Sequence, residues 1–441
     1  MKQEKKKLSL IEVISMAVGT MIGASIFSIF GLGVKLAGVD LPLAFLLSGV
    51  YAMAVAYSYA MLGRKIISDA GPMAFIIKGW GDNLLTGTLS ILYWFSFVVS
   101  IALFAKGFTG YFLPLFHISQ TPLHTGLTIT GLIVFFTALN FLGSKTVGKA
   151  EFWIVLIKLS ILLLFIVAGF KYINWEQVKP VFDTPHLKGL LNASIVFFLS
   201  YMGFGLVTNV SENMENPQKN VPRAIFISIF IVMLIYLGIS VVTLGNLSVS
   251  EIIKASEDAL AVAAEPFLGH WGFLLVSVGA LFSISSALNA TIYGGANIAY
   301  SLSKEGFLPQ QFERKVWFNA TEGLYITSAL GLFLALFFNL NAIAVITTAV
   351  TTMIYIFVLM AHYRHIEIFG GKKWIVLVNL FILFFVFIAL MVYQWKTQKD
   401  AFVTSILVFL VAFVLEYFYR KYINRDFKKS RVLQNNQLTQ K

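Results

Sequence analysis

Long apolar stretches separated by short polar loops recur along the whole chain. Each stretch has about 20 residues, the length that a helix needs to cross the hydrocarbon core of a bilayer. The pattern therefore predicts an all-α polytopic membrane protein with twelve transmembrane helices. We expect these helices at residues 9–33, 41–63, 84–112, 123–142, 150–170, 189–210, 223–245, 271–300, 323–340, 342–362, 374–395 and 400–420.

The composition and the placement of charge support this prediction and orient the chain. Hydrophobic residues make up 58% of the sequence and charged residues 12%, against about 45–50% and 25% in soluble domains. With a cytoplasmic N-terminus at residues 1–8, the two termini and the predicted inner loops together hold 24 of the 33 Lys and Arg residues, and the outer loops hold 8. This bias predicts cytoplasmic termini in a multi-pass cell-membrane protein, with a basic tail at 421–441 near anionic headgroups. It also explains the net charge of +12 without a nucleic-acid partner.

The sequence lacks the usual marks of an enzyme. It contains no cysteine, which excludes disulfides, thiol catalysis and cysteine-based metal sites. It contains no HExxH, GxSxG or phosphate-binding loop motif. We therefore expect no catalytic residues, no metal site and no cofactor.

Glycines at mid-membrane depth mark the first and the sixth span. Gly19 and Gly23 lie in the first span, and Gly203 and Gly205 lie in the sixth. Close helix packing through small residues is one explanation. Interruption of each helix is the other, because backbone at this depth can be irregular where protein or a water-filled cavity satisfies it.

The order of the spans favours interruption. The first span opens a set of five at 9–170, and the sixth opens a second set of five at 189–362, followed by two helices at 374–420. Five is odd, so the second set enters the membrane from the opposite side and the sets form inverted repeats. Interrupted spans at matching places in two such halves indicate a transport site. The N-terminal end of one half-helix offers unpaired N–H groups, which suit a carboxylate. The C-terminal end of the other half-helix offers carbonyl groups, which suit an ammonium. An α-amino acid carries both groups, so we expect one as the substrate.

Lys158 is the only ionisable residue in the apolar run from Phe152 to Phe170. It lies roughly 12 Å from the cytoplasmic start of its span, at about 1.5 Å per residue. Snorkelling of the amine toward the headgroups is one explanation. A proton relay or an ion site is the other, because buried ionisable residues in membranes are usually functional and burial favours the neutral amine. We expect Gly19, Ser283 and Ser286 as its neighbours, although the serines could equally serve helix packing.

Several ordered motifs resemble the amino acid–polyamine–organocation superfamily over nearly the whole chain. They are Gly19 to Phe27 in the first span, Asp69-Ala70-Gly71-Pro72 after the second, Glu215-Asn216-Pro217 with Val221-Pro222-Arg223-Ala224 before the seventh, and Tyr300 with Lys304-Glu305-Gly306 and Leu308-Pro309 after the eighth. The resemblance, strongest to archaeal proton-coupled amino-acid transporters, implies a LeuT-like 5+5 inverted repeat with broken helices 1 and 6.

The resemblance also implies which residues contact the substrate and the coupling ion. Lys158 falls where sodium-coupled relatives bind an ion, so we expect a proton and no sodium as the coupling ion. Many relatives carry Glu where this chain has Gly205, which leaves Lys158 as the stronger proton carrier. The implied substrate-binding residues are Gly19, Thr20, Met21, Ile22, Gly23, Ala24 and Ser25 in the first span, and Phe198, Leu199, Tyr201, Met202, Gly203 and Phe204 in the sixth.

These inferences predict a secondary active transporter that carries out proton-coupled symport of amino acids, with broad specificity, by alternating access. An exchanger on the same fold is the nearest alternative, and an amino-acid sensor that does not transport is a more distant one. The expected partners are small-molecule amino acids and the lipid bilayer. The sequence leaves the preferred amino acids and the oligomeric state open.

Overall fold

A computed structural model describes residues 7–68, 70–141, 147–316 and 320–423. Eleven of its helices are long and apolar enough to cross a membrane, and the shorter apolar helix Glu322–Phe337 adds a twelfth. The predicted all-helical membrane fold is therefore confirmed. Most of the predicted cytoplasmic N-terminus (1–6), most of the predicted basic tail (424–441) and Asp69 of the second motif lie outside the described residues.

The helices lie close to the predicted ranges. Their bounds are α1 (Leu10–Met21), α2 (Ala24–Ser28), α3 (Phe30–Ala37), α4 (Leu41–Gly63), α5 (Pro72–Trp80), α6 (Leu84–Leu115), α7 (Pro122–Phe141), α8 (Val147–Phe170), α9 (Thr184–Phe197), η2 (Phe198–Gly205), α10 (Leu206–Asn209), α11 (Pro217–Asn246), α12 (Val249–Ala255), η4 (Ser256–Asp258), α13 (Ala259–Lys304), α14 (Glu322–Phe337), α15 (Leu340–Arg364), α16 (Ile366–Phe369), α17 (Lys373–Thr397) and α18 (Lys399–Tyr422). The first predicted span thus comprises α1, α2 and α3, and the sixth comprises α9, η2 and α10.

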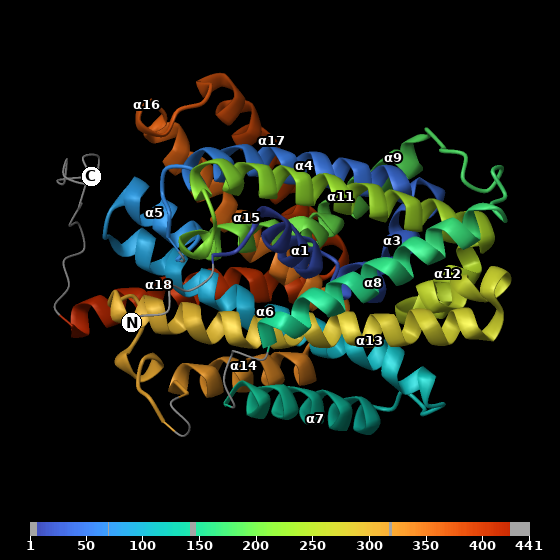
Figure 1. Ribbon diagram of the computed structural model, residues 1–441. Coiled ribbons are helices and arrows are strands. Elements are labelled where there is room, and N and C mark those ends of the chain that lie inside the picture. The colour runs from blue at the N-terminus through green and yellow to red at the C-terminus, as the bar shows by residue number, and fades with distance from the viewer. Residues whose placement is uncertain (1–6, 69, 142–146, 317–319, 424–441) are drawn as a thin grey trace.

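The long helices run side by side, and α1 lies in their midst (Figure 1). Helix α6 packs along α13, α4 packs along α11, and α1 contacts α11, η2 and α8. The short helices α5 and α16 lie at one end of the bundle and α12 lies at the other. This separation agrees with the prediction that successive loops lie on opposite sides of the membrane. Which end of the bundle faces the cytoplasm stays a prediction.

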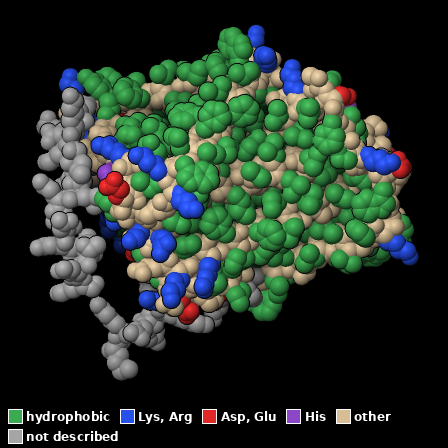
Figure 2. Space-filling model, turned by 90° about the horizontal axis from the view of Figure 1, so that it is seen from above, with side chains coloured by type: hydrophobic (Ala, Val, Ile, Leu, Met, Phe, Trp, Pro, Cys, Tyr) green, Lys and Arg blue, Asp and Glu red, His purple; other side chains and the backbone are tan. Residues whose placement is uncertain are grey.

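The outer surface of the bundle is apolar. Hydrophobic side chains cover most of the face seen in Figure 2, and Lys and Arg side chains gather toward its margins. Within the apolar 18-residue stretch of each helix, only 17% is buried in α7, 33% in α17 and 22% in α18. In water such exposed apolar area would drive association, so a lipid environment fits this surface.

The segment before the eighth span differs from its prediction. Ser248 followed by Glu251 is a capping-box pattern, which predicts a short amphipathic helix over 249–264. The capping box is present, but α12 ends at Ala255 because Ser256 adopts a left-handed φ of 56°. The following helix α13 is itself interrupted at Gly269, whose φ of 63° is not helical. The spanning part of α13 therefore begins after Gly269, close to the predicted start at 271.

Candidate functional site

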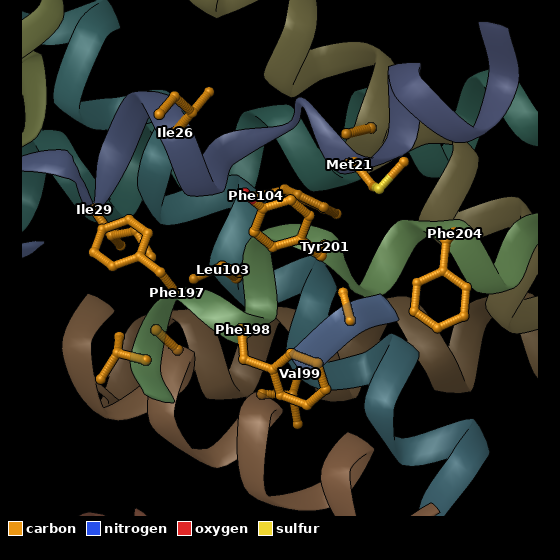
Figure 3. Packing of buried hydrophobic residues seen from close by; sticks show 14 of the residues in the cluster. Met21, Ile26, Ile29, Val99, Leu103, Phe104, Phe197, Phe198, Tyr201 and Phe204 are labelled. Carbon is orange, nitrogen blue, oxygen red and sulfur yellow. The ribbon is translucent and has the colours of Figure 1, made fainter. Parts of the chain in front are cut away.

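The interruption predicted for the first span is present. Helix α1 ends at Met21, and Ile22 and Gly23 leave the helical region with ψ values of 65° and −136°. Helix α2 starts at Ala24 and ends after five residues at Ser28. Figure 3 shows the thin link after Met21 where the ribbon changes direction. So short a helix has a small dipole, and any anion at its start would be held by individual N–H groups.

The sixth span is distorted in a different way from the one predicted. Instead of a gap, residues Phe198–Gly205 form a 3₁₀-helix between α9 and α10. A 3₁₀-helix is wound more tightly than an α-helix and keeps i→i+3 hydrogen bonds. Backbone groups at membrane depth need such partners, so the tighter winding changes the direction of the side chains without leaving the backbone unpaired.

The two irregular segments touch each other through a glycine. A Cβ atom on Gly203 would lie 2.7 Å from the Met21 nitrogen and 2.9 Å from the Thr20 carbonyl carbon. Both distances are shorter than real Cβ atoms tolerate. The backbone of η2 therefore approaches the end of α1 at a place where only glycine fits.

The Lys158 amine binds the backbone at the end of α1. Its Nζ donates to the Gly19 carbonyl oxygen at 2.5 Å and to the Ile22 carbonyl oxygen at 3.0 Å. Ser283 Oγ also donates to the Ile22 carbonyl, at 2.7 Å. Lys158 is 1% exposed, so the snorkelling alternative is wrong. The structure thus brings together Lys158, Gly19 and Ser283 as predicted, and Ser286 lies buried less than one turn further along α13.

A cavity of about 170 Å³ lies beside the break. Seven of the predicted substrate-binding residues line it: Thr20, Met21, Gly23, Ser25, Leu199, Met202 and Gly203. Gly19, Ile22, Phe198, Tyr201 and Phe204 are not among the lining residues. The side chain of Ala24 is not described. The cavity therefore contains about half of the predicted contacts.

The 3₁₀ winding explains why the sixth span divides in this way. With 3.0 residues per turn, side chains at i and i+3 lie on the same face. Phe198, Tyr201 and Phe204 share one such face and are fully buried in the aromatic core, as Figure 3 shows for their rings. Leu199 and Met202 share the next face and line the cavity. The aromatic side chains thus pack in the protein core on the side of the 3₁₀-helix away from the cavity.

Most of the remaining cavity wall comes from residues that the sequence did not single out. Helices α4, α6, α13 and α15 contribute polar, aromatic and aliphatic side chains to it. These are Tyr59, Tyr93, Ser96, Phe97, Ser100, Leu103, Phe104, Thr291, Thr347, Thr351, Ile354 and Tyr355. These residues lie in continuous helical stretches, in α13 after its interruption at Gly269, and no local pattern in the sequence sets them apart. Among the described residues, no group of three or more His, Asp or Glu side chains is placed to hold a metal ion.

Comparison with known proteins identifies the family. A family model described as "Amino acid permease" matches residues 8–415 of this chain. The chain is 58% identical to the uncharacterized protein MJ0609 of Methanocaldococcus jannaschii over 98% of this chain and 99% of that protein. It is 32% identical to the inner membrane transport protein YbaT of Escherichia coli over 82% and 84% of the two chains. It is 27% identical to the methylthioribose transporter of Bacillus subtilis over 82% of each.

The matched residues include both irregular spans, Lys158 and every helix that lines the cavity. The relatives with functional names are transporters, which are not enzymes, and the fold has the apolar helices of a multi-pass membrane protein. The chain therefore belongs to the amino acid permease family of the amino acid–polyamine–organocation superfamily.

Proposed function

We propose that this protein is a proton-coupled amino-acid symporter of broad specificity, in which Lys158 carries the coupling charge. The single observation on which the proposal rests is the contact of the buried Lys158 amine with the Gly19 and Ile22 carbonyls at the break in the first span. The same break forms one wall of the cavity. Proton binding and substrate binding would therefore act on one short stretch of backbone.

The cavity suits the charged groups and the size of a small amino acid. The first N–H groups of a helix have no acceptors within it, and those at the start of α2 can bind a carboxylate. The carbonyls at the end of α1 can accept from an ammonium. A dry cavity of about 150 Å³ holds benzene, and alanine has as many non-hydrogen atoms as benzene. A cavity of about 170 Å³ therefore has room for a small amino acid.

The contacts of Lys158 provide a route for coupling. A charged amine forms hydrogen bonds roughly twice as strong as neutral ones. Loss of the proton would weaken its hold on the Gly19 and Ile22 carbonyls, which flank the cavity-lining residues Thr20 and Met21. The binding segment would then be held differently in the two protonation states, and linkage makes the effect reciprocal.

The same contacts argue for a proton in place of sodium. Two carbonyl oxygens accept from the amine, and the Ser283 hydroxyl donates to one of them, the Ile22 carbonyl. Oxygen ligands of this kind also suit a hard cation. A positive amine among them would repel a sodium ion. In the proposed inverted-repeat mechanism, the spans that form the cavity would rock against the other spans. Lys158 would remain next to the break in the first span during this motion.

Uptake into proteoliposomes tests the proposal. An imposed inward proton gradient is expected to drive accumulation of labelled alanine, and an imposed sodium gradient is expected not to. Lys158→Ala should abolish the proton-driven uptake, whereas Lys171→Ala, which changes an exposed amine just beyond the same helix, should leave it intact. Uptake that depends only on amino acid inside the vesicles would show an exchanger and refute symport. Pre-loaded vesicles without a pH gradient provide that comparison.

A further inference from the structure

A buried tyrosine of the seventh span reaches both irregular segments. Tyr236 lies on α11 and is fully buried. Its ring packs against Phe45 with centroids 5.1 Å apart and against Tyr201 with centroids 5.4 Å apart. Rings on two sides restrict the orientation of this side chain, so its hydroxyl is held in one place.

The Tyr236 hydroxyl contacts a carbonyl from each irregular segment. It lies 2.7 Å from the Met21 carbonyl oxygen and 3.2 Å from the Ser200 carbonyl oxygen. A phenol has one proton to donate, so the two oxygens share it. In a continuous helix the Met21 carbonyl would accept from the Ser25 N–H. Here the side-chain hydroxyl of Ser25 donates to the Met21 carbonyl oxygen at 3.4 Å. The Tyr236 hydroxyl, at 2.7 Å, makes the shorter of the two contacts.

The position of this contact relates it to the cavity. Met21 lines the cavity, and so do Leu199, next to Ser200, and Gly203, one turn of the 3₁₀-helix further on. Two carbonyl oxygens that converge on one point repel each other in a medium of low dielectric constant unless a donor lies between them. The hydroxyl supplies that donor, and the absence of a side chain at Gly203 lets the same two backbones approach closely.

We infer that Tyr236 is a positioning residue for amino-acid binding, whose hydroxyl holds the end of α1 and the 3₁₀-helix together as one binding unit. This inference rests on the proposed function. The role is distinct from that of Lys158, because the two side chains serve different carbonyls: Met21 and Ser200 for Tyr236, Gly19 and Ile22 for Lys158. Removing the phenol hydroxyl should weaken substrate binding and leave the pH dependence of uptake unchanged.

Tyr111 provides a matched control. It is a fully buried tyrosine on α6 whose hydroxyl donates to the Phe27 carbonyl of the first span at 2.8 Å. Tyr111→Phe therefore removes the same kind of hydrogen bond to the same span, without a bridge to the sixth. A general effect of losing one buried hydrogen bond would appear in both variants.

The experiment is equilibrium binding of labelled alanine to purified wild-type protein, Tyr236→Phe and Tyr111→Phe, with uptake measured from pH 5 to 8. Tyr236→Phe should raise Kd at least tenfold without moving the pH profile, and Tyr111→Phe should stay within threefold of wild type. Incorporation of 4-aminophenylalanine at position 236 restores a donor and should restore Kd. If Tyr236→Phe does not fold, 4-methylphenylalanine fills the same volume without a donor and should show the same loss.

Three results would overturn the inference, and they are distinguishable. Equal Kd values for wild type and Tyr236→Phe would refute the positioning role alone. Equal losses in Tyr236→Phe and Tyr111→Phe would show a general packing effect, and a shifted pH profile in Tyr236→Phe would show that its hydroxyl acts on the proton site. Wild-type protein that binds no amino acid in a mixed panel would refute the proposed function itself.

Discussion

Replacing Gly203 by Ala tests whether the contact between the two irregular segments sets substrate affinity. The new methyl group would lie 2.7 Å from the Met21 nitrogen and 2.9 Å from the Thr20 carbonyl carbon. Both neighbours are backbone atoms, which cannot rotate away as a side chain can. The end of α1 and the 3₁₀-helix would have to separate, and both line the cavity.

The size of the effect follows from the cost of overpacking. An extra methyl group in a well-packed interior costs about 1–3 kcal/mol, which corresponds to a roughly 5- to 150-fold loss of affinity if the bound state needs the close contact. Gly205→Ala is the control on the same 3₁₀-helix, because its Cβ would lie 4.0 Å from its nearest neighbour, on Tyr59. Gly205 also lines the cavity, so this variant adds a methyl group to the cavity wall without pushing the two backbones apart. We expect its Kd to stay within about threefold of wild type.

Equilibrium binding of labelled alanine and thermal unfolding in the same detergent provide the assay. Gly203→Ala is expected to raise Kd by the stated factor in the protein that remains folded. Wild-type affinity in this variant would refute the reasoning, since the two backbones would then not need to touch. An equal loss in Gly205→Ala would show that any added methyl group on this helix disturbs binding.

Two further predictions concern neighbouring contacts. Ser283→Ala removes one of two donors to the Ile22 carbonyl at a cost of about 0.5–1.5 kcal/mol, so proton-driven alanine uptake should fall and yet persist; complete loss would show that Ser283 is itself essential for coupling. Arg420→Ala removes the partner of the buried Glu416 and of Asp82 and should destabilise the fold by about 3–5 kcal/mol. Thermal unfolding of Arg420→Ala and of Lys421→Ala, which changes an exposed neighbour, measures this loss of stability. Equal unfolding midpoints in the two variants would contradict the prediction.

The sequence identifies the parts of the site that differ from an ordinary apolar helix. Gly19 and Gly23 predict the break in the first span, and Lys158 is a lone charge in an apolar run. Because both signals are local, their residues could be named without coordinates. Once the spans are assigned, a buried amine and an interrupted helix at similar depth are natural partners, and the structure joins Lys158 to Gly19.

The parts that the sequence does not identify depend on how helices wind and face one another. The sixth span is a 3₁₀-helix, and its period of 3.0 in place of 3.6 turns Phe198, Tyr201 and Phe204 away from the cavity. Ser100 and Tyr355 line the cavity only because α6 and α15 turn those faces inward. The left-handed Ser256 that ends α12 early carries no sequence signal either.

The most direct test of the central claim measures the proton itself. Proteoliposomes loaded with a pH-sensitive dye, with no gradient at the start, receive alanine on the outside. We predict that the interior acidifies with wild-type protein and with Lys171→Ala, and does not acidify with Lys158→Ala. Acidification at the wild-type rate with Lys158→Ala would contradict the claim that this amine carries the coupled proton.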